Sequence, residues 1–237
     1  MPKQICIPLP NCDFDLTEVA VPWMHFVKQG FHVTFSTEQG MPGATDPLLI
    51  KGVIFGQLGA KPDAIRAYRK LENDPHFLNP IRYDQIDASK YDALLLPGGH
   101  AKGMRPYLEN EELQRKVLDF FRLNKIIGAI CHGPIVLART IEPVTGKSVI
   151  YNKRITALPK ALERIAYYLT FWKHGKYYRT YPEYVQDEIT RQLKEKHQFT
   201  QGPSQYKPFV VEDGNLITAR WPLDAHLFAQ TLIRKLE

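Results

Sequence analysis

The sequence predicts an α/β protein built on a mainly parallel sheet with helices on both faces. Two observations support this prediction. Apolar clusters of strand length alternate with helical patterns along the whole chain, which is typical of strands joined by crossover helices. The clusters at 91–96 (YDALLL) and 125–130 (KIIGAI) are apolar runs, as expected for strands covered on both faces. The 237 residues suit one large domain, 1–237.

The first half of the chain contains two clear strands around one helix, followed by an irregular region. Thr17 is a suitable N-cap for that helix, and Gly30 is a suitable stop. Gly, Pro and Asp are frequent from 40 to 90, so we expect an excursion from the core that forms a lid or an interface. The elements predicted here are strands 3–9 and 31–36 and helices 17–30 and 62–73.

The second half continues the alternation and ends in a hairpin and a helix. The segment 110–123 is amphipathic. Its predicted apolar face consists of Leu113, Val117, Leu118 and Phe121. The turn Asp213-Gly214 is a strong hairpin signal. The other predicted elements are strands 91–96 and 125–130, a short helix to about 139, a strand pair near 148–157, helices 160–173 and 183–196, hairpin strands within 208–219, and helix 223–236.

The composition excludes several classes of function. The hydrophobic fraction of 44% and the charged fraction of 24% are ordinary for a soluble globular protein. The net charge of +6 comes from 31 basic and 25 acidic residues that are interleaved, so no basic face for nucleic acid is apparent. No apolar run approaches the about 20 residues of a membrane helix, and the N-terminus has no signal-peptide pattern. We therefore expect a cytoplasmic protein that binds neither nucleic acid nor membranes.

The cysteines also favour a reducing compartment. Cys6, Cys12 and Cys131 are an odd number at low density, which is untypical of a disulfide framework. No His or second Cys pair follows the first two at the spacing of a zinc site. We expect neither a metal nor a cofactor.

The segment 126–133 (IIGAICHG) has the layout of a nucleophile elbow. An apolar strand runs directly into Cys131, with Ala129 two residues before it and Gly133 two residues after it. Small neighbours are needed because the nucleophile of such a turn has a strained backbone. The following helix should point its N-terminal amides at the sulfur, and His132 is available as a proton acceptor or a cationic partner. Both features should favour the thiolate.

Two further segments should meet Cys131 at the carboxyl edge of the sheet. The strand 91–96 ends in a PGG turn, whose glycines let backbone amides approach a ligand. The amides of Gly99 and His132 are candidates for an oxyanion hole. Glu18, in the first turn of the first helix, is a candidate to hydrogen-bond the sulfur or carry a proton, although a carboxylate at a helix start is also an ordinary stabilising feature.

With these three segments together, the sequence resembles the PfpI superfamily, which includes PfpI-type proteases, the parkinsonism-linked deglycase and the heat-shock glyoxalase III chaperones. The resemblance spans nearly the whole chain and rests on DLTEVAVPW, DALLLPGGHAKGM, AICHGP, ITALP and DGNLITA. It implies a flavodoxin-like three-layer sandwich.

The resemblance also implies residue roles. Cys131 is the implied nucleophile, Glu18 is the carboxylic acid at its sulfur, and the amides of Gly99 and His132 form the oxyanion hole. In the glyoxalase III branch, an acidic residue in the helix after the ITALP-like segment orients the histidine. That position falls on Glu163 in TALPKALER, so the resemblance implies a triad of Cys131, His132 and Glu163. Glu163 is otherwise an ordinary charge on a helix surface.

Three functions compete at this stage. The leading hypothesis is a glutathione-independent glyoxalase, in which Cys131 adds to a 2-oxoaldehyde and a hydroxy acid is released. The alternatives are an amide hydrolase or peptidase with the same Cys-His-Glu site, and a stress chaperone or redox sensor that uses Cys131. A glutamine amidotransferase is disfavoured because His226 lacks a closely following Glu. The aromatic and basic segment 166–185 matches no motif, so the small-molecule substrate stays open between aldehyde and amide. We expect a homodimer.

Overall fold

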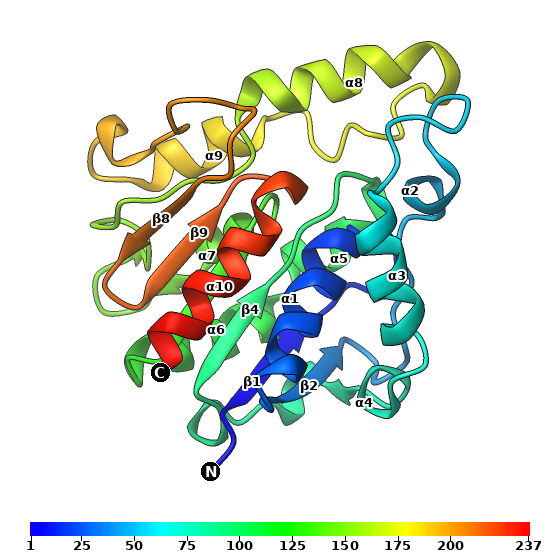
Figure 1. The fold of residues 1–237 in the computed structure, drawn as a ribbon. Helices are drawn as coiled ribbons and strands as arrows, with labels where there is room; N and C mark the ends of the chain where they lie inside the picture. Colours follow the sequence, from blue (N-terminus) through cyan, green and yellow to red (C-terminus); the bar gives the residue numbers. More distant parts are fainter.

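A seven-stranded sheet forms the centre of the molecule in the computed structural model, which describes residues 1–237 (Figure 1). The strands lie in the order β3-β2-β1-β4-β5-β9-β8, and only β8 is antiparallel to its neighbour. Their bounds are β1 (Gln4–Pro8), β2 (His32–Thr37), β3 (Ile81–Arg82), β4 (Ala93–Leu96), β5 (Ile126–Ile130), β8 (Val210–Asp213) and β9 (Leu216–Ala219). The predicted α/β class with a mainly parallel sheet is confirmed.

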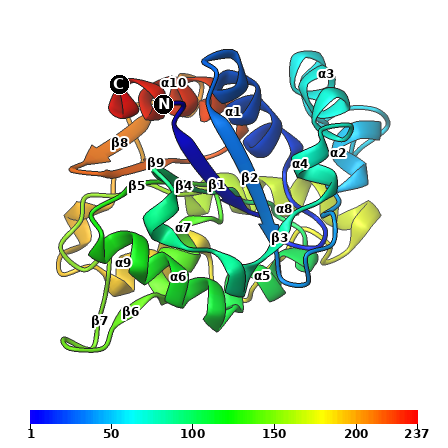
Figure 2. The same cartoon turned by 90° about the horizontal axis from the view of Figure 1, so that it is seen from below.

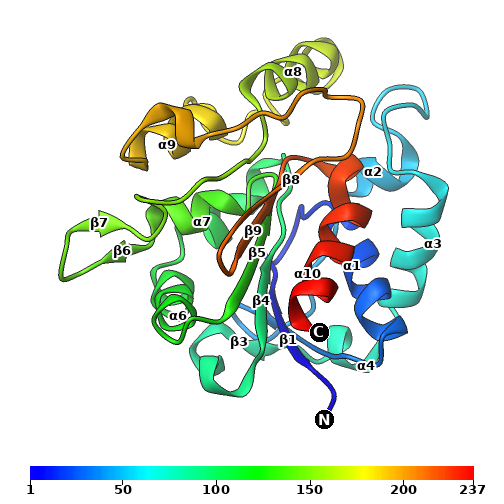
Figure 3. The same ribbon diagram turned by 60° about the vertical axis from the view of Figure 1, so that its left-hand side comes forward.

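Helices cover both faces of this sheet and complete a three-layer sandwich (Figures 2 and 3). One face carries α1 (Leu16–Lys28), α3 (Pro62–Leu71) and α10 (Ala225–Leu236). The other carries α5 (Arg105–Glu109), α6 (Glu111–Arg122), α7 (Pro134–Arg139) and α9 (Val185–Gln192). The remaining elements are α2 (Pro47–Lys51), α4 (Pro75–Leu78), α8 (Lys160–His174) and the small hairpin β6 (Ile141–Glu142) with β7 (Lys147–Ser148). No helix is both long and apolar enough to span a membrane.

The central strands are apolar on both sides because both sides are covered. Every residue of β4 and β9 is buried. Gly128 of β5 leaves room for α10, since a Cβ at that position would lie 2.8 Å from the Phe228 ring and 2.9 Å from a Leu232 methyl group. On α6 the structure buries Phe120 fully and Phe121 only in part. The predicted Phe121 was therefore the wrong choice, because Phe120 follows Leu113 by seven residues and lies on the same helical face.

The region 40–90 divides between the sandwich and its edge. The helix α3 packs against α1, and β3 pairs with β2 at the end of the sheet. The short helix α2 and the turn after it lie beyond the sheet, close to α8. A hydrogen bond of 2.7 Å joins a ring nitrogen of His174 to the carbonyl oxygen of Val53, so this part of the region contacts the helix that covers the carboxyl edge.

Two predicted elements differ from the structure. The strand pair near 148–157 does not form beyond β7, and Ile155 pairs only through a single bridge to Phe199. Its neighbour Thr156 donates its amide to the hydroxyl of Thr218 on β9 instead, so a side chain replaces the expected strand partner. The predicted helix 183–196 ends at Gln192. The predicted helix 160–173 is confirmed as α8, which lies across the carboxyl edge of the sheet (Figures 1 and 3).

Candidate active site

Cys131 lies in the turn between β5 and α7. Its φ of 61° is in the left-handed region that residues with side chains rarely adopt. The Cys131 amide donates to the carbonyl oxygen of Ala219 at 3.1 Å, and the Cys131 carbonyl accepts from the amide of Leu158 at 3.2 Å. These two hydrogen bonds hold the backbone in the strained conformation that is typical of a nucleophile elbow.

Gly133, two residues later, is required by lack of space and not by its backbone conformation. The φ of Gly133 is −50°, which any residue can adopt, but a Cβ there would lie only 2.1 Å from the carbonyl oxygen of Leu96. The close approach of the turn to β4 therefore depends on this glycine. The helix α7 starts at Pro134 and has six residues, so its dipole is short.

Glu18 enters the site from the opposite side of the sheet, on α1. The N-cap of this helix is Asp15, whose side chain accepts a hydrogen bond from the amide of Thr17 at 2.8 Å. Glu18 is fully buried. Its Oε2 accepts a hydrogen bond from the amide of Gly98 at 2.9 Å, whereas Oε1 has no nitrogen or oxygen partner. The carboxyl group lies against the thiol of Cys131.

Gly98 is the point at which the three groups converge. A Cβ at this position would lie 2.6 Å from the amide nitrogen of His132, 2.8 Å from Cβ of Cys131 and 2.9 Å from Oε2 of Glu18. Only glycine fits there. The sequence analysis placed the oxyanion hole at Gly99 and gave Gly98 no role of its own, although the double glycine after a buried strand was the available signal.

Burial decides the protonation of the Glu18–Cys131 pair. Burial, with a contribution from the Asp15 carboxyl, raises the pKa of Glu18 well above its ordinary value. Burial, and then the Glu18 carboxyl, also raise the pKa of the Cys131 thiol. The expectation that the elbow favours a thiolate finds no support in these directions, because burial disfavours the charged form of both groups.

The imidazole of His132 lies between the thiol of Cys131 and the hydroxyl of Thr180. Its Nδ1 lies 3.4 Å from Sγ of Cys131, and its Nε2 lies 3.2 Å from the hydroxyl oxygen of Thr180. The imidazole is fully buried, and burial lowers its pKa well below the ordinary value. The ring is therefore neutral, so it is available as a proton acceptor and does not provide the cationic partner that was considered.

Glu163 is near the imidazole but bonds to other groups. It lies in the first turn of α8, where its Oε1 accepts from Arg179 at 3.3 Å and its Oε2 accepts from the amide of Val185 at 3.0 Å. Burial raises its pKa to about 7 against the opposing effect of these two donors. The structure brings Glu163 into the site, but the group in contact with Nε2 of His132 is the Thr180 hydroxyl, which the sequence analysis missed.

The two amides expected to form an oxyanion hole have different surroundings. The amide of His132 is directed at the Cys131 sulfur. The amide of Gly99 donates to no backbone acceptor and to no side chain of the protein, although the residue is tightly enclosed, with a Cβ at its position 2.4 Å from the carbonyl oxygen of Asp13. The Gly99 amide is therefore a donor without a protein acceptor, and stabilisation of a developing oxyanion requires such a donor.

A family model described as ThiJ/PfpI family-like matches residues 9–203. The chain belongs to this family. A glutathione-independent glyoxalase of Schizosaccharomyces pombe is 31% identical over 158 residues, which cover 65% of this chain and 62% of that protein. Glyoxalase 3 of Candida albicans is 24% identical over 226 residues, which cover 94% of this chain and 89% of that protein.

The fold is also that of a solved glyoxalase III. The crystal structure of this protein from Candida albicans matches with a TM-score of 0.75 at 20% identity, over 99% of this chain and 98% of that chain. Membership of the ThiJ/PfpI family and the flavodoxin-like three-layer sandwich, which the sequence resemblance implied, are confirmed.

In this family member, one donor set next to the thiol has the residue types of a metal site. One ring nitrogen each of His100 and His132 and one oxygen of Glu163 lie within 4.8 Å of one another. Glu163 already pairs with Arg179, and His132 is bonded on both sides. Only Nε2 of His100 is buried without a partner. Two of the three side chains are therefore already bonded to other protein groups, and the nearby guanidinium opposes a cation.

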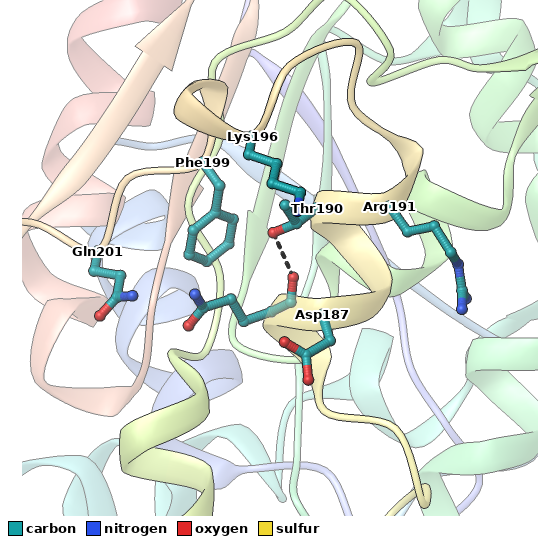
Figure 4. A pocket seen from close by; sticks show the side chains of 7 residues that line it. Asp187, Thr190, Arg191, Lys196, Phe199 and Gln201 are labelled. Atoms are coloured by element: carbon teal, nitrogen blue, oxygen red, sulfur yellow. Dashed lines mark hydrogen bonds between the residues drawn. The ribbon is translucent and has the colours of Figure 1, made fainter.

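A cavity of about 560 Å³ lies away from these groups, between α9 and the segment after it (Figure 4). It is lined by Gln186, Asp187, Thr190, Arg191, Lys196, Phe199 and Gln201. The dashed line in Figure 4 is the internal helix bond from the Thr190 hydroxyl to the Gln186 carbonyl. The candidate site itself is closely packed, with Cys131 only 5% exposed, so a substrate that reaches the sulfur must be small.

Proposed function

We propose that this protein is a glutathione-independent glyoxalase that converts small 2-oxoaldehydes such as methylglyoxal into 2-hydroxy acids. One observation supports the proposal above the others: Nδ1 of His132 lies 3.4 Å from the sulfur of Cys131, and the carboxyl of Glu18 lies against the same thiol. This arrangement supplies a nucleophile, a base and an acid within a site that admits only a small carbonyl compound. The names of the relatives support the same activity.

The first chemical step is addition of the thiol to the aldehyde. His132 Nδ1 accepts the thiol proton as the bond between sulfur and the aldehyde carbon forms. The aldehyde π bond breaks, and the oxyanion develops where the amides of Gly99 and His132 can donate to it. The oxygen then takes up the proton, so the product is a hemithioacetal with no net change in charge. Glu163 and Thr180 each lie close to the imidazole, which carries a positive charge transiently in this step.

The second step moves hydrogen between two carbons. A carboxyl group donates its proton to the ketone oxygen, and the carboxylate then removes the proton from the hemithioacetal carbon, which gives an enediol. The same carboxyl returns that proton to the neighbouring carbon and accepts the hydroxyl proton of the sulfur-bearing carbon. Glu18 lies beside the sulfur and has an oxygen free of other partners, so it is the group that we assign to this transfer. The result is a thioester of a 2-hydroxy acid on Cys131. Water then cleaves the thioester and restores the thiol. The aldehyde carbon is oxidised to the level of an acid and the ketone carbon is reduced to an alcohol, so no external oxidant or reductant is needed.

A comparison of four proteins tests the function. Methylglyoxal loss and lactate formation without glutathione are measured for wild type, Cys131→Ser, Glu18→Gln and the control Cys12→Ser, which alters an exposed thiol. We expect activity in wild type and the control, and a loss on the order of 100-fold or more in the other two variants. A wild-type protein that is inert toward methylglyoxal and glyoxal but releases amines from peptide amides would move the assignment to the hydrolase. Inertness toward both substrates would favour the chaperone or redox role.

We also propose that the active form is a homodimer in a reducing, cytoplasmic compartment. All three cysteines are free thiols, which favours such a compartment. The support for self-association is the outer surface of α8, where large apolar side chains are exposed to solvent. They are Ile165, Tyr168, Leu169, Phe171 and Trp172, each about half exposed or more.

A further inference from the structure

The hydroxyl of Thr180 links the His132 ring to the loop that follows β4. Thr180 is fully buried. Its oxygen lies 2.8 Å from the carbonyl oxygen of His100 and 3.2 Å from Nε2 of His132. Its backbone is fixed as well, because the side chain of Arg105 donates to the Thr180 carbonyl at 2.6 Å. One hydroxyl therefore serves two neighbours, and its single proton can go to only one of them.

The hydroxyl of Thr180 donates its proton to the His100 carbonyl oxygen. A carbonyl oxygen cannot donate, and no other protein group donates to this one. The shorter of the two distances is also the one to the carbonyl. Thr180 must then accept from His132, so the imidazole proton is on Nε2. This arrangement satisfies all three hydrogen bonds in the series. Nε2–H of His132 donates to Thr180, the Thr180 hydroxyl donates to the His100 carbonyl, and the Cys131 thiol donates to Nδ1 of His132.

The opposite tautomer satisfies fewer groups. With the proton on Nδ1, the Nε2 lone pair would face the Thr180 oxygen. Either two lone pairs would then meet, or the hydroxyl would turn to Nε2 and leave the His100 carbonyl without a donor. A polar group left without its partner costs about 1–3 kcal/mol, which favours the other tautomer by roughly 5- to 150-fold. The ring is buried and neutral, so it has only these two states.

We propose that Thr180 is a positioning residue that holds His132 in the Nε2–H tautomer and thereby aims the Nδ1 lone pair at the thiol of Cys131. The tautomer itself is a property of the resting protein. Its consequence for turnover rests on the proposed function, in which Nδ1 accepts the thiol proton. Thr180 thus takes the orienting part that the sequence resemblance gave to Glu163, while Glu163 remains bonded to Arg179 and a backbone amide.

The tautomer is measured directly on the full-length protein. Two-bond proton–nitrogen correlation spectra of ¹⁵N-histidine-labelled protein separate the two tautomers, and the His132 signals are assigned by their loss in His132→Gln. We expect wild type and Thr180→Ser to show the Nε2–H form alone. We expect Thr180→Val, which is of similar size but cannot accept the bond, to show a mixture or the Nδ1–H form. A wild-type spectrum with the proton on Nδ1 would overturn the proposal.

Kinetics provide the second measurement. We expect Thr180→Val to lower kcat on the order of ten- to a hundredfold with little change in KM, and Thr180→Ser to stay within about threefold of wild type. The control is Thr231→Val, which also removes a hydroxyl bond to a carbonyl, that of Leu227 in α10, and should leave kcat unchanged. Wild-type turnover by a Thr180→Val protein would overturn the proposal.

The two measurements separate this proposal from the proposed function. If wild type turns over no aldehyde, the glyoxalase assignment fails, and the spectrum still decides the tautomer. If Thr180→Val does not fold, the wild-type spectrum and the comparison of Thr180→Ser with wild type remain decisive. A serine variant that shows the Nδ1–H form would contradict the role of the hydroxyl.

Discussion

At the scale of single residues, Glu163 shows how burial and pairing compete. Its carboxyl is almost fully buried, and a guanidinium and a backbone amide both donate to it. Burial is the larger effect and raises the pKa to about 7. A carboxyl whose folded pKa exceeds its unfolded value binds more protons in the folded state, so it favours folding less as the pH rises between the two values.

Glu163→Gln should remove this dependence on pH. Between about pH 4.5 and 7, the free energy of unfolding of wild type should fall relative to that of the variant by up to about 3 kcal/mol, the equivalent of the pKa shift. Urea unfolding of both proteins at several pH values measures the difference, with the exposed Glu111→Gln as the control. If the free energy of unfolding of wild type minus that of Glu163→Gln stays constant or rises with pH, Arg179 compensates the buried charge fully.

The environment of the Cys131 thiol could be predicted from the sequence only in part. The motif around Cys131 correctly predicted a sharp turn between a strand and a helix, with small neighbours. The pKa of the Cys131 thiol depends on burial and on Glu18 and Asp15, which come from the start of a helix on the other face of the sheet. A local pattern predicts a positive helix end next to the sulfur, but burial of the whole group outweighs a dipole of six residues.

At the scale of elements, the elbow depends on how closely its turn approaches β4. The junction from β5 to α7 passes so near Leu96 that only a hydrogen atom fits on Gly133. The same junction fixes Cys131 through its bonds to β9 and to the segment before α8. Three elements thus hold one backbone conformation, and a displacement of any of them moves the sulfur relative to His132 and Glu18.

Gly133→Ala should therefore impair both stability and activity. The added methyl group has to displace backbone atoms, so we expect a loss of about 1–3 kcal/mol in the free energy of unfolding and at least a roughly tenfold loss of turnover because the sulfur shifts. The control is Gly30→Ala, where the φ of 73° strains an alanine but no atom lies within 4 Å of its Cβ. It should cost about 1 kcal/mol in stability without a loss of activity. Equal behaviour of the two variants would refute this account of the elbow.

At the scale of the whole molecule, α8 has two different faces. Its inner side contributes Glu163 to the site and bonds through His174 to the turn after α2. Its outer side carries a stripe of Ile165, Tyr168 and Leu169 with Trp172 at the end. A helix that is apolar toward solvent gains from burying that face against another surface, and a second copy of the chain supplies one.

Sedimentation velocity tests the homodimer. We expect wild type to sediment as a dimer at micromolar concentration, and a Leu169→Ser, Trp172→Ser double variant to sediment as a monomer, because the substitutions remove much of the apolar area that association would bury. Tyr206→Ser is the matched control, since Tyr206 is 80% exposed and lies in another segment. A monomeric wild type would rule out the dimer, and a dimeric double variant would place the interface elsewhere.

The sequence by itself determined the class of fold, the strand that leads into Cys131 and the family. These follow from local patterns: apolar runs of strand length, small residues around Cys131 and a hairpin turn at Asp213-Gly214. Each pattern states a backbone requirement that only a few residue types satisfy. For the same reason α8 was predicted nearly to its bounds, whereas the strand pair near 148–157 was not, because its partner there is a side chain on β9.

Only the tertiary structure decided which groups surround the imidazole. Thr180 lies 48 positions after His132, in a loop between α8 and α9 whose sequence has no periodic pattern. Gly98 could be distinguished from Gly99 only when the distances to Glu18, Cys131 and His132 were known. Hydrogen bonds and proton positions depend on distances of a few tenths of an ångström between segments remote in sequence, and no local rule of chain geometry encodes such distances.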